Sequence, residues 1–174
     1  MVSRDAGFCV WVAGQPASVV TTIARAVALE LAHVRPVEEA GTGPDWLDDA
    51  EPEVRWRVLA HLARALVADG TAVVLATGWP EEAGRAEMRQ TVPQLVEVRV
   101  DRSCGAGAGD GAGERRPSGI APEVLVDGDG ARAGESARVV LRHLATAGYS
   151  EPVDEYTDDD EAAVSGRLQA FGYL

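Results

Sequence analysis

Two short apolar runs, each followed by a turn and then by a helical repeat, constrain the fold of this chain more than any other feature. Residues 8–13 and 71–77 are almost entirely apolar, and their length and lack of alternation indicate strands covered on both faces. Apolar spacing predicts helices over 18–33 and 81–91, directly after these runs. Strands that alternate with helices imply right-handed crossovers and a mostly parallel sheet.

The remaining elements continue this alternation. Further strands are expected at 35–37, 95–100 and 122–127, and further helices at 52–69 and 137–147. In the 52–69 helix, the expected core stripe consists of Val58, Leu59, Leu62 and Leu66. The prediction is an α/β fold in three layers, with a central sheet of four or five strands flanked by helices. Ligands bind such sheets where the strands end, which places the candidate site at 14–22, 38–39, 77–85 and from 101 onward.

Charge composition excludes several classes of function. All 16 basic residues are arginine, and the chain has no lysine, which excludes a Schiff-base lysine and the lysine of a phosphate-binding loop. The net charge of −12 repels nucleic acid and anionic membranes, so we expect neither as a partner. No segment approaches the roughly 20 apolar residues of a membrane helix, and a cytoplasmic location is expected. Cys9 and Cys104 are too few for a disulfide framework or a zinc site.

Two segments differ from the rest in composition. Residues 102–119 are rich in glycine and alanine and are expected to form a mobile loop. We expect one domain over 1–150, followed over 151–174 by an acidic linker and an amphipathic C-terminal helix. The apolar positions of that helix are Ala162, Val164, Leu168 and Phe171. It could cover the core of its own chain or dock on a partner.

Residues 7–14 (GFCVWVAG) are followed by a Thr-Thr pair at the start of a helix, residues 21–26 (TTIARA). Both stretches resemble the pattern G-F-x-V-W-x-x-G-x-x-x-x-G-K-T-T-I-A-R-A of the adenylylsulfate kinase family. Collinear matches continue at 62–76, 79–85, 96–101, 121–127 and 135–149. The resemblance implies a P-loop NTPase-like fold. It also implies transfer of the ATP γ-phosphate to the 3′-hydroxyl of adenosine 5′-phosphosulfate (APS), which forms 3′-phosphoadenosine 5′-phosphosulfate (PAPS).

The resemblance also implies which residues bind the nucleotide, the metal and the substrate. It implies ATP and Mg²⁺ as cofactors, with Gly14, Ser18, Thr21 and Thr22 at the nucleotide and the Thr21 hydroxyl at the metal. The substrate-binding candidates are Arg55, Arg85 and Arg89. Two simpler interpretations remain open: Thr21 and Thr22 could merely begin a helix, and Arg85 and Arg89 could be solvated partners of Glu81 or Glu82.

The residues that would carry the chemistry are largely replaced. Val20 stands where the family has the loop lysine, Ala17 and Val19 replace loop glycines, and Pro16 has no N–H to donate. The family's acidic motif is reduced to residues 38–39, and its lid is replaced by 104–119. No catalytic residue is therefore assigned, and ATP binding is expected to be weak or lost. We expect the turn before Thr21 to take another path, with Val19 or Val20 filling the phosphate space.

The expected function is that of a catalytically impaired homologue, a pseudokinase of sulfate activation. Such a protein would bind or support a partner, either an active kinase or another sulfate-activation or sulfo-transfer enzyme, and the family implies a homodimer. Two alternatives stay open: an active phosphotransferase with an atypical nucleotide site, and a module that senses APS or PAPS without chemistry.

Overall fold

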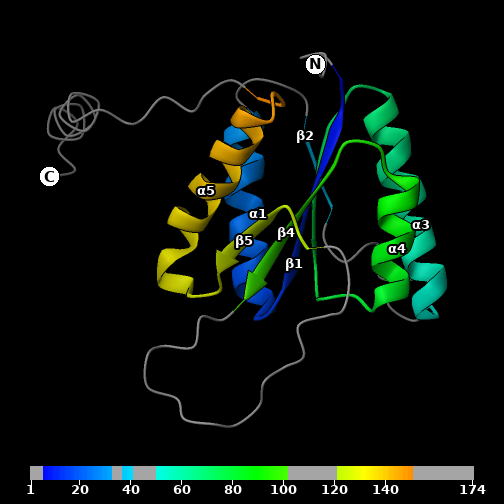
Figure 1. Cartoon of the computed structure of the whole chain (residues 1–174), viewed down its shortest axis with the longest axis horizontal. Coiled ribbons are helices and arrows are strands. Elements are labelled where there is room, and N and C mark those ends of the chain that lie inside the picture. Colours follow the sequence, from blue (N-terminus) through cyan, green and yellow to red (C-terminus); the bar gives the residue numbers. More distant parts are fainter. Residues whose placement is uncertain (1–5, 33–36, 41–49, 102–120, 151–174) are drawn as a thin grey trace, which may run out of the picture.

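Five parallel strands form the centre of the part of the chain that the structure, a computed structural model, describes: residues 6–32, 37–40, 50–101 and 121–150 (Figure 1). The strands are β1 (Phe8–Gly14), β2 (Val37–Ala40), β3 (Ala72–Thr77), β4 (Leu95–Asp101) and β5 (Val124–Asp127), in the spatial order β2-β3-β1-β4-β5. Val10 of β1 lies opposite Val74 of β3 on one side and Val96 of β4 on the other. The predicted parallel sheet, with residues 8–13 beside 73–76, is confirmed.

Helices cover both faces of the sheet. They are α1 (Ala17–Ala32), α3 (Pro52–Ala68), α4 (Glu82–Thr91) and α5 (Ala133–Thr146), with a short 3₁₀ turn η1 (Gly130–Arg132) before α5. Helices α1 and α5 pack together on one face, and α3 and α4 pack together on the other (Figure 1). The three-layer α/β prediction is therefore confirmed. Among the described residues, no helix combines the length and the apolar character needed to cross a membrane.

Strand β1 lies between two separate cores. Phe8, Val10 and Val12 contact the core under α1 and α5, whereas Cys9 and Trp11 contact the core under α3 and α4. Every residue of β1 is buried, which is why its sequence shows an unbroken apolar run instead of an alternation. The indole N–H of Trp11 donates to Thr77 Oγ1 at 2.9 Å, so the polar atom of this buried ring is satisfied.

Two element boundaries differ from the sequence expectation by several residues. Strand β2 covers 37–40 instead of 35–37, and α5 begins at Ala133 instead of 137. The earlier start of α5 has a local cause: the Asp129 carboxylate accepts the N–H of Ala131, and the Ser136 hydroxyl donates to the carbonyl of Asp127. These bonds turn the chain into a helix as soon as β5 ends. The predicted loop at 102–119 and the C-terminal helix lie outside the described residues.

The core stripe expected in α3 is wrong in part. Leu59 is buried as expected, but Leu62 is 45% exposed, and the other buried positions are Ala60, Ala63 and Val67. The physical reason is the contact with α4. Trp56 packs so closely on Gly84 that a Cβ at Gly84 would lie 2.6 Å from the indole, and this contact turns a different face of α3 inward.

Candidate functional site

The candidate site lies at the edge of the sheet where the strands end. Because all five strands are parallel, the helices that follow them begin at this one edge, which is the lower edge in Figure 1. The N–H groups of a helix N-terminus favour anions, so this edge is where a phosphate would bind. The decisive geometry is the connection from β1 to α1.

Gly14 ends β1 in a conformation that suits only glycine. Its φ is +151°, and a Cβ at this position would collide with the carbonyl oxygen of Val100 in β4. Gly14 is thus required for the close packing of β1 on β4. Only Gln15 and Pro16 separate it from the first residue of α1, Ala17. Residues 17–22 are therefore helical and do not form an open loop.

The first turn of α1 uses the backbone groups that a phosphate would need. The N–H groups of Val19 and Val20 both donate to the carbonyl of Pro16, at 3.0 and 3.2 Å. The side chains point into the protein: Val20 is 1% exposed and lies in the same core as Val27, and Val19 lies against Gly130. Val20 is thus a core residue of the α1 stripe, and the N–H groups of Val19 and Val20 are bonded within the turn.

The predicted hydroxyl ligands lie on the same helix. Ser18, Thr21 and Thr22 are exposed, and the two threonine hydroxyls donate to the carbonyls of Ala17 and Ser18 at 3.0 and 2.8 Å. Such bonds to the carbonyl four residues earlier are common for threonine inside a helix. The residues at this turn do not fit the triphosphate of ATP well, because the N–H groups of Val19 and Val20 are already bonded to Pro16.

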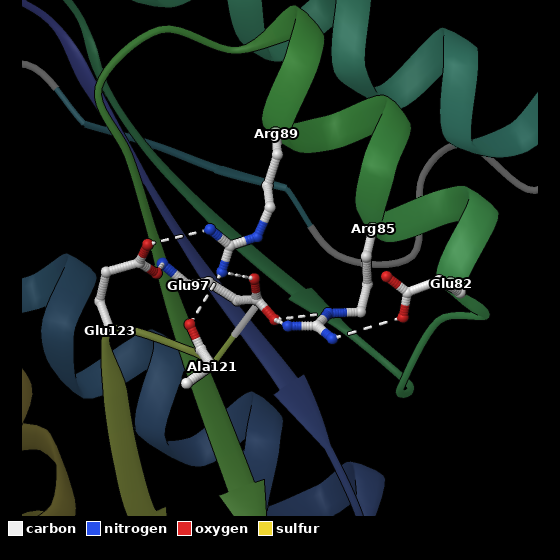
Figure 2. A network of polar contacts seen from close by, with 6 residues as sticks. All are labelled: Glu82, Arg85, Arg89, Glu97, Ala121 and Glu123. Atoms are coloured by element: carbon white, nitrogen blue, oxygen red, sulfur yellow. Dashed lines mark hydrogen bonds and ion pairs between the residues drawn. The ribbon is translucent and has the colours of Figure 1, made fainter. Parts of the chain in front are cut away.

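Arg85 and Arg89 are brought together by a buried carboxylate that the sequence analysis did not single out. Arg85 of α4 contacts Glu97 Oε1 of β4 through Nε at 2.8 Å and Nη2 at 2.7 Å, and Arg89 Nη2 lies 2.5 Å from Glu97 Oε2 (Figure 2). Glu97 is fully buried and Arg85 is 3% exposed. The interpretation of solvated arginines does not hold for Arg85, whose main partner is Glu97 and whose contact with Glu82 is peripheral, at 3.7 Å. Arg89 is 22% exposed and also holds Glu97.

The same network extends to the segment that precedes β5. Arg89 also contacts the Glu123 carboxylate at 3.2 Å and the Ala121 carbonyl at 3.3 Å, and the backbone N–H of Glu97 donates to Glu123 at 2.8 Å (Figure 2). The arginines thus join α4, β4 and the start of β5. Their charge is directed at internal carboxylates, which leaves a phosphate or sulfate a weaker attraction here than the sequence pattern suggests.

The third substrate-binding candidate lies on a different element. Arg55 is in the first turn of α3 and is half-buried.

Trp79, just after β3, contacts two guanidinium groups with its ring, that of Arg85 at 5.0 Å and that of Arg99 at 4.7 Å from the ring centroid. Arg99 also pairs with Asp101 at 3.2 Å. Sequence reasoning missed Glu97, Glu123 and the role of Trp79; the signal was a glutamate between Val96 and Val98 in the buried part of a strand.

A small depression in the described surface lies away from the β1–α1 turn. Its volume is about 140 Å³, and it lies between the beginnings of α3 and α4, lined in part by Glu53, Trp56, Glu81 and Glu87. Sites for cofactor-sized ligands usually enclose about 300 Å³ or more. Its lining combines three glutamates with a single arginine, Arg57, and this net negative set also disfavours a phosphate group.

The chain is similar in sequence and in fold to proteins already known. No family model matches the sequence. The chain is 32% identical over 113 residues to the adenylyl-sulfate kinase of Myxococcus xanthus, a match that covers 57% of this chain and 60% of the relative's length. A hexameric APS kinase from Thiobacillus denitrificans superposes with a TM-score of 0.65 at 22% identity, covering 84% of this chain and 30% of that one. The crystal structure of APE1195 gives a TM-score of 0.61 at 20% identity, over 84% and 98% of the two chains. The described chain thus has an APS-kinase-like, P-loop NTPase-like α/β fold, as the sequence resemblance predicts.

Proposed function

We propose that this chain is an adenylyl-sulfate-kinase-like protein that no longer transfers phosphate and instead supports a partner in sulfate activation. The similarity to a named adenylyl-sulfate kinase supports the pathway. The observation that carries the loss of catalysis is the first turn of α1, where Val19 and Val20 are buried and their N–H groups bind Pro16.

Phosphoryl transfer depends on charge stabilisation that this turn does not offer. A working loop directs several N–H groups and a lysine at the β- and γ-phosphates, and these interactions supply most of the catalysis. Here the lysine position is Val20, and no lysine exists elsewhere in the chain. Arg85 and Arg89, which the sequence pattern offered as anion-binding groups, hold the buried Glu97.

The proposal extends to cofactor and substrate. ATP and Mg²⁺ would bind weakly or not at all, at Gly14, Ser18, Thr21 and Thr22. A homodimer, or a complex with an active kinase or another sulfate-activation enzyme, would then carry the function. The one observation that favours a sensor of APS or PAPS instead is the set of exposed hydroxyls at the start of α1.

Calorimetric titrations of the full chain with ATP–Mg²⁺, APS and PAPS, together with a PAPS-formation assay, test this function. We expect no turnover above background and an ATP affinity weaker than millimolar. Binding of APS or PAPS without ATP would replace the proposal with the sensor function.

The control variant is Thr21→Ala, because Thr21 carries the hydroxyl that the family resemblance places at the metal, and it is exposed. Turnover in the unmodified chain that disappears in Thr21→Ala would refute the loss of catalysis. It would also show that the first turn of α1 opens to admit the nucleotide. Light scattering of the chain alone and with an adenylyl-sulfate kinase tests the homodimer and the complex.

A further inference from the structure

Helix α3 exposes an apolar face on the side opposite its core contacts. Val54 is 47% exposed, Leu62 is 45% exposed, and Val58 between them is half-buried. The spacing of four residues places these three side chains, with the exposed Ala65, along one side of the helix, which we call the α3 outer face. The opposite side carries the buried Ala60, Ala63 and Val67. A helix that is apolar on both sides is typical of one that is covered on both sides.

The borders of the α3 outer face are positively charged. Arg57 and Arg64 are exposed on one border, and the half-buried Arg55 lies on the other. Between Pro52 and Ala68 there are three arginines and one glutamate, which gives this helix a net charge of +2 in a chain whose total is −12. Apolar side chains between cationic borders fit a segment that is itself acidic and amphipathic. A second copy of α3 fits poorly, because it would bring two cationic helices together.

We propose that the α3 outer face is the docking site of the chain's own C-terminal segment, residues 151–171. Residues 151–161 contain seven carboxylates and no basic residue. They are followed by apolar side chains at helical spacing, among them Val164, Leu168 and Phe171. The charge matches the arginine borders, and the apolar residues match Val54, Val58 and Leu62.

The length of the segment allows this contact. The described chain ends at Ser150, just after α5, and both α5 and α3 end at the edge where the strands begin (Figure 1). The eleven residues 151–161 span up to about 36 Å when extended. That exceeds the length of α3 itself, which at 17 residues is about 25 Å. The acidic residues can therefore cross the edge of the sheet, and the apolar residues can lie along α3.

Photo-crosslinking in the full chain tests the docking. A benzoylphenylalanine in place of Leu62 is compared with one in place of Leu29, which is 59% exposed but lies on α1 at the other face of the sheet. We expect adducts with peptides of residues 151–174 from position 62 and few from position 29. The combined change Leu168→Asp and Phe171→Asp should lower the yield at position 62 about tenfold, because it removes the buried apolar contacts.

Charge reversal provides the second readout. The change Arg57→Glu with Arg64→Glu should lower the adduct yield and make the remaining yield insensitive to salt. The control Arg142→Glu, at an exposed position of α5, should change neither. Far-UV circular dichroism confirms that each variant is folded. An equal yield from positions 62 and 29, no adduct with 151–174, or adducts that join isotope-labelled and unlabelled chains would each overturn the proposal.

Discussion

Removing the charge of Glu97 should destabilise this protein more than any other single isosteric change in the network. Glu97 is fully buried, and it holds Arg85 at 2.7 Å and Arg89 at 2.5 Å. In Glu97→Gln the shape is kept, but two guanidinium groups lose the carboxylate that compensates their charge. Breaking a buried ion pair by neutralising one partner costs about 3–5 kcal/mol.

This loss of free energy is large compared with the total stability of a single domain. Single domains unfold with a free energy of about 5–15 kcal/mol, so Glu97→Gln removes a third or more of the stability in most of that range. A loss of 3–5 kcal/mol corresponds to a fall in melting temperature of about 10 °C. Urea unfolding followed by circular dichroism measures the free energy, and differential scanning calorimetry measures the melting temperature.

Two variants make the measurement decisive. Glu82→Gln is the control: Glu82 is 62% exposed and lies 3.7 Å from Arg85, so its loss should cost less than about 1 kcal/mol. Adding Arg85→Met to Glu97→Gln should recover part of the loss, because one uncompensated buried charge is removed as well. A Glu97→Gln protein within about 1 kcal/mol of the unmodified chain would refute the claim that this network stabilises the fold.

Three further changes test other parts of the structure. Gly84→Ala should destabilise the fold by at least about 1 kcal/mol in urea unfolding, although alanine favours helix, because its Cβ meets the Trp56 indole; increased stability would contradict this contact. In a Cys104→Ser background, Cys9 should react with Ellman's reagent only after denaturation, since burial raises the pKa of its thiol. Because the unfolded thiol ionises first, Cys9 should also make stability fall as the pH rises above about 9, a loss that Cys9→Ala should remove in urea unfolding at pH 8 and pH 10. Gly14→Ala should lower soluble expression severely, because a Cβ there collides with β4; a normal melting temperature would show that the turn can rearrange.

The fold could be predicted from sequence because its strands are buried on both faces. Runs such as 8–13 and 72–76 are apolar without interruption, and their limits lie close to glycine and turn residues. The inward face of α3 could not be predicted in the same way. It depends on the contact between Trp56 and Gly84, which are 28 positions apart in the sequence, and a helical repeat alone does not select between Leu62 and Ala63.

In the candidate site, too, some features could be predicted from the sequence and others could not. Pro16, Val19 and Val20 are adjacent in sequence, so their effect on the β1–α1 turn follows from residue type. The network around Glu97 joins residues 12 and 26 positions apart, and sequence spacing on α4 alone suggested solvated arginines. Buried polar side chains that form hydrogen bonds and ion pairs with residues distant in sequence can be identified only when the fold is known.

Under the proposed function, the burial of Val19 and Val20 makes a change to an ATP-binding loop costly in folding stability. To open the first turn of α1, both valines would have to leave the core, each forfeiting about 1.5–3 kcal/mol of apolar burial. Replacing Val20 alone by lysine would place a cation where the exposed fraction is 1%, with no phosphate path yet open. Each single step toward a nucleotide loop is therefore less stable than the present chain and gains no ligand. Selection for folding alone is then sufficient to keep the turn closed.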